Sequence, residues 1–256
     1  MSLYRDDGIV LRTHKLGEAD RIITILTRRT GRVRAVAKGV RRTRSRFGAR
    51  LEPFTHVDLL LYTGRSLDVI TQAETVRPYG EPLAADYPRY TSGTAMLEAA
   101  ERFTPVEKEP SIRQFLLLVG GLRALGEQAH DPRLVLDAYL LRTLAVAGYA
   151  PALDECAVCG TPDPVADPDA GSVASTGSRV FSVPAGGLTC RTCRPPGAAT
   201  PSVVTIALMR ALLRGDWAHA DASLPRPREE CSGLVAAYVQ WHLEHSIRSL
   251  RHVEHV

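Results

Sequence analysis

Four of the five cysteines in this 256-residue chain form two Cys-x-x-Cys pairs, Cys156/Cys159 and Cys190/Cys193. Two residues between cysteines let both sulfurs reach one metal ion, and two such pairs supply the four tetrahedral ligands of a structural zinc site. We therefore expect one structural Zn²⁺, held by Cys156, Cys159, Cys190 and Cys193 in a module over residues 151–197. A closed four-thiolate site favours a structural role over catalysis.

Other interpretations of the cysteines are weaker but stay open. The stretch between the two pairs, residues 160–189, is longer than in a usual zinc ribbon, so four unrelated core cysteines are the alternative. A redox role is disfavoured because neither pair lies at a strand-to-helix junction of a βαβ unit. A zinc deaminase needs His-x-Glu upstream, whereas His130 is followed by Asp131-Pro132. Cys231 is left over, and its helical pattern predicts a buried bystander.

The net charge of +4 conceals a strong asymmetry. Residues 1–80 hold 16 Lys and Arg against 8 Asp and Glu, whereas the rest of the chain holds 16 against 20. Between Arg28 and Arg50 there are ten basic residues and no acidic one. Such a concentration of like charge indicates a polyanion partner, with a merely solvated face as the alternative. We therefore expect a nucleic acid as the ligand.

The N-terminal 80 residues show the pattern of short strands separated by turns. The predicted strands are 8–16, 21–27, 32–40, 54–62 and 67–76, with turns at Thr30-Gly31 and Gly64-Arg65. Five short strands predict a small OB-type β-barrel, whose open face commonly binds oligonucleotides. A generic five-stranded barrel has the same pattern.

From residue 81 onward the pattern becomes helical. Thr91 or Ser92 is the expected cap of one helix, Pro110-Ser111 opens a second, and Asp131-Pro132 opens a third that Gly148 ends. Two more helices are expected over 202–214 and 229–252. The predicted fold is α+β: an OB-type domain over 1–80, an α-helical domain over 81–150 and 198–256, and the inserted zinc module over 151–197.

The expected DNA contacts are the basic residues of the first three strands and the loop that follows them. A phosphate-binding Gly-x-x-x-x-Gly-Lys-Ser/Thr loop and a paired acid and base are both missing from the sequence, so we expect no enzyme. Phe47 and Tyr62 are candidates for base stacking, with a core role as the alternative. The expected contacts are Arg28, Arg29, Arg32, Arg34, Lys38, Arg41, Arg42, Arg44 and Arg46.

The apolar runs are too short to span a bilayer, and residues 1–8 lack the features of a secretory signal. Together with an odd total of five cysteines, four of them in metal-binding spacing, this predicts a cytoplasmic, nucleoid-associated protein with no membrane partner.

Several segments, taken in order, resemble the RecO family of bacterial recombination mediators. Toward the end of the chain the first cysteine pair with Gly160, Gly186-Gly187 before Cys190, and Ser249-Leu250 are also similar to that family. The matching N-terminal segments are Gly8-Ile9-Val10-Leu11, Gly17-Glu18-Ala19-Asp20-Arg21, Leu26-Thr27, Gly31-Arg32, Ala37-Lys38-Gly39, Ser45-Arg46-Phe47-Gly48, Leu51-Glu52-Pro53-Phe54, Ser66-Leu67 and Ile70-Thr71-Gln72-Ala73-Glu74.

The resemblance implies a mediator of DNA repair and homologous recombination without catalytic turnover. Proteins of this kind bind single- and double-stranded DNA, anneal complementary strands and, with RecR and single-strand binding protein, help to load recombinase. The acidic C-terminal tail of single-strand binding protein is an expected ligand of the helical domain. The alternative from another class is a zinc-containing adaptor whose basic barrel binds acidic protein tails. A zinc hydrolase requires that one of the four cysteines does not bind the metal.

Overall fold

A computed structural model of the chain describes residues 2–43, 45, 47–164, 179–243, 250 and 253. Contacts divide the chain into two compact units, Met1–Pro132 with Ile247–Val256, and Arg133–Ser246. The domain boundaries expected from the sequence separate strands, helices and the cysteine module, whereas these two units are defined by contacts. The expected boundaries therefore stay a prediction.

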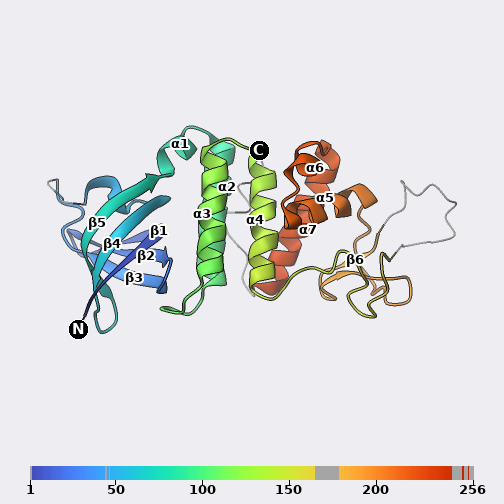
Figure 1. The fold of residues 1–256 in the computed structure, drawn as a ribbon, viewed down its shortest axis with the longest axis horizontal. Coiled ribbons are helices and arrows are strands. Elements are labelled where there is room, and N and C mark those ends of the chain that lie inside the picture. The colour runs from blue at the N-terminus through green and yellow to red at the C-terminus, as the bar shows by residue number, and fades with distance from the viewer. Residues whose placement is uncertain are drawn as a thin grey trace. The chain divides into compact units, whose positions relative to one another are not determined.

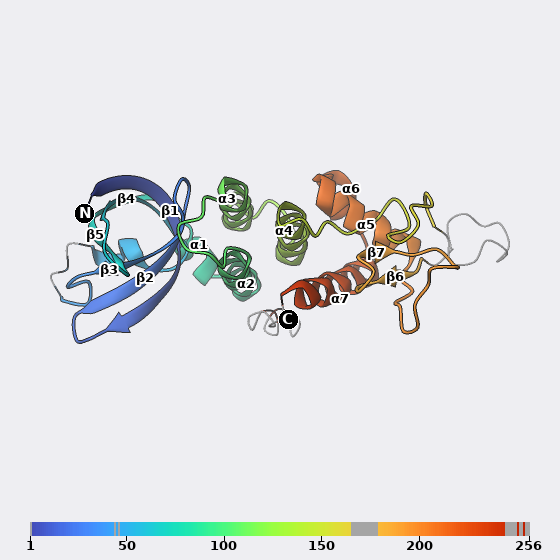
Figure 2. The same cartoon turned by 90° about the horizontal axis from the view of Figure 1, so that it is seen from below.

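The first unit begins with a closed barrel of five strands in the order β1-β2-β3-β5-β4 (Figures 1 and 2). β1 pairs with both β2 and β4, and a short parallel pairing of β3 with β5 completes the ring. The predicted five-stranded barrel is thereby confirmed. The strands are β1 (Leu3–Leu16), β2 (Asp20–Thr27), β3 (Gly31–Ala37), β4 (Thr55–Tyr62) and β5 (Asp68–Pro78).

β1 extends five residues further toward the N-terminus than the sequence pattern predicted. The carboxylate of Asp6 is buried, and it accepts hydrogen bonds from the backbone N–H of Thr30 at 2.9 Å and from the Thr30 hydroxyl at 2.8 Å. An acidic residue therefore lies inside the strand because it satisfies the donors of the β2–β3 turn.

Apolar residues after β3 contribute to the barrel core. The 3-10 helix η1 (Gly48–Leu51) follows Phe47, and the side chains of Phe47 and Leu51 both belong to the barrel core, each 1% exposed. Of the two predicted base-stacking candidates, Phe47 is therefore a core residue, whereas Tyr62 at the end of β4 is 38% exposed.

The first unit continues with α1 (Gly80–Ala84), α2 (Tyr87–Phe103) and α3 (Ile112–Gly126), of which α2 and α3 pack side by side (Figures 1 and 2). The predicted start of α2 was wrong. Asp86 caps the helix by accepting from the Arg89 backbone N–H at 3.0 Å, and Pro88 lies in the first turn, where proline is favoured. Thr91 and Ser92 are buried inside the helix.

The segment between α2 and α3, residues 104–109, lies along β3. The Lys108 backbone N–H donates to the carbonyl of Arg32 at 2.9 Å, and Glu107 forms a parallel bridge with Arg32. The Lys108 ammonium reaches the buried carboxylate of Asp68, at 2.9 Å. This segment, which sequence analysis did not single out, is therefore bound to the barrel by both backbone and side-chain contacts.

The second unit contains α4 (Pro132–Val146), α5 (Val203–Arg214), α6 (Trp217–Asp221) and α7 (Pro225–His242), with two short strands before α5. α4 begins at Pro132 and ends before Gly148, as predicted, and α5 covers the helix predicted over 202–214, with Ser202 as its cap. α7 begins four residues earlier than expected because its first residue is a proline. Most of the predicted continuation beyond Leu243 lies outside the described residues. None of the described helices is both long and apolar enough to cross a membrane.

Candidate metal centre and basic surface

A small network of backbone contacts brings the two cysteine pairs together. The strands β6 (Phe181–Ser182) and β7 (Gly187–Leu188) form a hairpin directly before Cys190. The Ala157 backbone N–H, inside the first pair, donates to the carbonyl of Leu188 at 2.7 Å. The turn of the first cysteine pair is therefore hydrogen-bonded to β7, the strand that leads into the second pair, and this contact brings the two pairs together.

Glycine is required at two places in this network. Gly160 has a φ of 72°, and its N–H donates to the Cys156 carbonyl at 2.8 Å, which completes the turn around the first pair. A Cβ at Gly187 would lie 2.3 Å from the carbonyl oxygen of Ala152, so only glycine permits the close approach of these two backbones.

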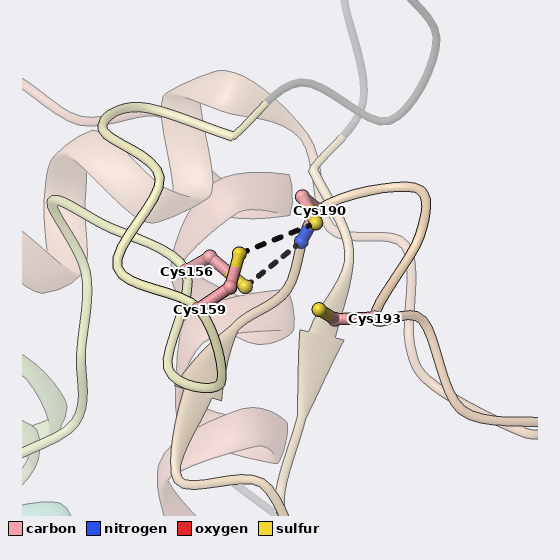
Figure 3. Close-up of side chains that lie close together, drawn as sticks. All are labelled: Cys156, Cys159, Cys190 and Cys193. Carbon is pink, nitrogen blue, oxygen red and sulfur yellow. Dashed lines mark hydrogen bonds between the residues drawn. The ribbon is translucent and has the colours of Figure 1, made fainter.

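The four sulfurs lie within 4.8 Å of one another (Figure 3). The sulfurs of Cys159 and Cys190 are 3.7 Å apart. Tetrahedral coordination with Zn–S bonds of about 2.3 Å requires sulfurs about 3.8 Å apart, so the residues fit such an ion. Among the described residues this is the one group of three or more metal-binding side chains close enough to hold a metal ion.

The electrostatics of the cluster also suit a cation. Burial opposes ionisation of Cys156, but backbone N–H donors, Cys159 first among them and Cys190 next, lower the pKa of its thiol to about 6. The Cys190 N–H lies 3.3 Å from the Cys156 sulfur. Hydrogen bonding to Cys190 raises the pKa of Cys193 to about 12, which keeps its proton on in the absence of a cation. A bound divalent ion would deprotonate all four.

Burial separates the ligand candidates from the fifth cysteine. Cys156 is buried, Cys190 and Cys193 are half-buried and Cys159 is exposed, whereas Cys231 lies fully buried within α7. Burial and the nearby carboxylates of Asp137 and Glu230 raise the pKa of the Cys231 thiol well above its usual range. Cys231 is therefore a buried bystander, as the sequence predicted.

One end of the barrel carries exposed cations from the loop after β3. Lys38, Arg41 and Arg42 are exposed there. The Arg41 guanidinium donates to the carbonyl of Glu18 at 2.8 Å, and its backbone N–H donates to that of Ala19, so this loop lies against the β1–β2 turn.

The predicted pair Arg28 and Arg29 lies at the opposite end of β3, about 20 Å away for seven residues of extended strand. Both are exposed, and Arg29 bonds to the carboxylate of Asp6 and the carbonyl of Arg5. The predicted contacts of the N-terminal domain therefore do not form one continuous patch.

Arg32 and Arg34, also predicted as DNA contacts, face the segment 104–109. The Arg32 guanidinium donates to the carbonyls of Thr104 at 2.6 Å and Pro105 at 2.5 Å, and its side chain is 12% exposed. Arg34 pairs with Glu107. Both side chains therefore make contacts within the chain. The predicted Arg44 and Arg46 lie outside the described residues.

One further cation, which sequence analysis missed, lies at the end of the barrel that carries Lys38, Arg41 and Arg42. Lys15 is exposed near the end of β1, and it pairs across the sheet with Arg21, which binds Glu52 at 2.6 Å. The sequence signal that could have located Lys15 is its position two residues before Gly17, which forms the β1–β2 turn with a φ of 58°.

The N-terminal part of the chain, residues 1–79, matches the family model for the N-terminal region of recombination protein O, and residues 84–251 match that for its C-terminal region. The DNA repair protein RecO of Thermobifida fusca is 67% identical over 254 residues, which cover 99% of each chain. Proteins of the same name are 60% identical in Streptomyces griseus, over 99% of this chain and 100% of the relative, and in Nocardioides sp., over 98% and 99%.

Proposed function

Because this chain belongs to the RecO family of DNA repair proteins, we propose that it binds single- and double-stranded DNA and anneals complementary strands. Lys38, Arg41 and Arg42 at the end of a closed five-stranded barrel carry the proposal. Cations there neutralise phosphates and release counterions, which gives affinity that is strongly dependent on salt and little dependent on sequence.

The proposed contact surface is the basic end, defined as Lys15, Lys38, Arg41 and Arg42 together with Arg44 and Arg46 from the sequence. Holding two strands on one positive surface lowers their mutual repulsion, which favours annealing. Arg28 and Arg29 are proposed as secondary contacts at the far end of β3. Arg32 and Arg34 are proposed to contribute least, because both face the segment 104–109: the Arg32 side chain is 12% exposed, and Arg34 pairs with the carboxylate of Glu107.

Binding is tested by fluorescence anisotropy of a labelled unstructured oligonucleotide across a salt series. We expect the triple variant Lys38→Ala, Arg41→Ala, Arg42→Ala to weaken binding at least about tenfold and to reduce the slope of log affinity against log salt by about 2. The matched control removes three exposed arginines elsewhere, Arg65→Ala, Arg113→Ala and Arg226→Ala, at equal net charge. Equal losses in the two variants would contradict a localised surface.

We further propose that the chain acts in the cytoplasm without catalytic turnover, with RecR and single-strand binding protein, to help load recombinase. The test follows annealing of complementary strands coated with single-strand binding protein, with and without RecR. The triple variant is expected to slow annealing while still binding the acidic C-terminal tail peptide. Loss of both DNA and peptide binding would instead favour the adaptor that binds acidic tails at the barrel.

The four cysteines are proposed to hold one structural Zn²⁺. When bound, the ion links the two cysteine turns and supplies folding free energy, and four thiolates leave no position for a substrate. Zinc content by elemental analysis is expected to be one ion per chain and to fall to none in Cys190→Ala. Retention of one ion in that variant would contradict the ligand set.

A further inference from the structure

A cavity of about 430 Å³ opens in the second unit beside the cysteine cluster. Its wall is formed by the residues that follow α4, by the first cysteine turn, by the β6–β7 turn and by α7; Tyr149, Cys156, Gly186 and His242 represent these four parts. The volume lies within the range of small-ligand sites. Nothing in the proposed DNA binding uses this cavity.

One side of the cavity is an aromatic wall. The ring of His242 stacks on Tyr149, with centroids 4.5 Å apart and 26° between planes, and meets Tyr238 edge-on at 4.6 Å. Burial lowers the pKa of His242, so its ring is neutral at pH 7. Tyr149 lines the cavity and is 46% exposed, so part of this residue stays accessible to a ligand. An accessible tyrosine face attracts cations through the ring quadrupole.

The charge of the cavity has one sign. Among the described residues that line it, Glu155 is the one with a carboxyl group, and none is a lysine or an arginine. Its carboxylate is exposed and forms no ion pair with another described residue. Cys156 lines the same cavity, and four thiolates around one divalent ion carry a net charge of −2; this second contribution rests on the proposed zinc site.

The other lining residues are small. Gly148, Ala150, Ala152, Ala157 and Ala185 contribute little side-chain bulk to the cavity that Tyr149 and Glu155 also line. A phosphate would be repelled by the carboxylate. A planar cation can instead stack on the tyrosine ring while its N–H groups donate to both carboxylate oxygens.

We propose that this cavity receives an arginine side chain of a partner protein, with the guanidinium stacked on Tyr149 and paired with Glu155. Arginine fits better than lysine because its group is flat and carries donors in a fork that matches a carboxylate. The site would dock a basic protein segment at the zinc module, separately from the surface that binds DNA.

The test uses the full-length, zinc-loaded chain and nuclear magnetic resonance. The backbone amides of Gly148, Gly160 and Gly186 line the cavity and report on occupancy. The probe is Nα-acetyl-arginine N-methylamide, compared with the leucine analogue and with adenosine monophosphate. We expect saturable shifts with the arginine probe, with a dissociation constant in the millimolar range.

The variant Glu155→Gln is expected to weaken binding of the arginine probe about fivefold, and Tyr149→Leu, which keeps an apolar side chain but removes the ring, to have a similar effect. The control Glu229→Gln removes an exposed carboxylate of α7 outside the cavity and should change nothing. Equal shifts with the leucine analogue, stronger shifts with the nucleotide, or no shifts at all would overturn the proposal. DNA affinity, measured in parallel, should be unchanged in Glu155→Gln, so failure here is distinct from failure of DNA binding.

Discussion

The barrel and the cysteine module are stabilised in opposite ways. The barrel has strands of 7 to 14 residues closed around a continuous apolar core, whereas the hairpin of the cysteine module has strands of two residues each. Two-residue strands cannot hold a structure by themselves. Apolar burial therefore stabilises the barrel, whereas the turns of the module are joined by a few backbone hydrogen bonds and, as proposed, by a metal ion.

The largest expected effect separates the two regions directly. Cys190→Ala, or removal of metal by a chelator, should abolish most of the zinc binding free energy, which is about 10–16 kcal/mol for small zinc-dependent folds. Hydrogen exchange should then rise in residues 152–164 and 179–193 and stay unchanged in β1 to β3. Cys231→Ala is the matched control, because it removes a buried thiol outside the cluster. Equal exchange in both variants would contradict a metal-dependent module.

The next effect acts on the barrel alone. Ile25 is fully buried in the barrel core, so Ile25→Ala should lower the free energy of unfolding by about 2–5 kcal/mol through lost contacts and a cavity. Ile25→Val, which removes one methylene, should cost about 1 kcal/mol. Urea denaturation monitored by hydrogen exchange in the barrel measures the free energy of unfolding of both variants. Zinc content should be unaffected, and a parallel loss of zinc would show that the two regions are not independent.

Asp68 is a buried acidic group of the barrel, and hydrogen bonds lower its pKa as they lower that of Cys156 in the cysteine cluster. Asp68 is buried, which by itself raises its pKa, but hydrogen bonds from Tyr4 at 2.6 Å, Lys108 at 2.9 Å and the Gly64 backbone at 3.0 Å outweigh burial and hold that pKa below its usual range. Asp68→Asn should therefore lower the free energy of unfolding by about 2 kcal/mol at pH 7.

The pH dependence gives the sign of the Asp68 effect. Because the pKa is lower in the folded chain than in the unfolded one, this carboxylate stabilises the fold above an unfolded pKa of about 3.9 and loses its contribution as pH falls through the folded value. Urea denaturation at several pH values should show the difference from Asp68→Asn shrinking only below about pH 4. Asp58→Asn, which breaks the exposed pair with Arg5, is the control, and a difference that vanished already at pH 6 would refute the assignment.

The smallest effect tests whether Arg32 serves the fold or the ligand. Arg32→Lys keeps the charge but cannot donate to the carbonyls of Thr104 and Pro105 together, so unfolding free energy should fall by about 1 kcal/mol. Oligonucleotide affinity, measured by anisotropy, should stay within about twofold of the parent chain. Arg42→Lys is the comparison at the basic end, and a selective loss of affinity in Arg32→Lys would restore Arg32 as a DNA contact.

The elements predicted from local signals were largely found where expected. Ser202 at the start of α5, Pro132 at the start of α4 and Gly148 after it act through backbone geometry and capping within a few residues, which are properties of local sequence. The start of α2 was misplaced because Thr91 and Ser92 have cap-forming side chains, but Asp86 before Tyr87-Pro88 caps one turn earlier.

Long-range contacts explain what was missed. The segment 104–109 binds β3 through Lys108 and Glu107. No local sequence pattern predicts a pairing between residues that are about 70 positions apart in the chain. The same holds for the cavity beside the cysteine cluster, whose Tyr149 and His242 are far apart in the sequence.

The five-stranded barrel, the helical remainder, the family and the grouping of four cysteines could all be predicted from the sequence, because alternation, capping and Cys-x-x-Cys spacing are local signals. Which cations share a surface depends on how the chain folds. Closure of the barrel places Lys38, Arg41 and Arg42 at one end and Arg28 at the other, and it turns Arg32 toward backbone carbonyls. The physical reason is that a charge run along the chain becomes a charged surface only after strand direction and pairing have assigned each residue to an end and a face.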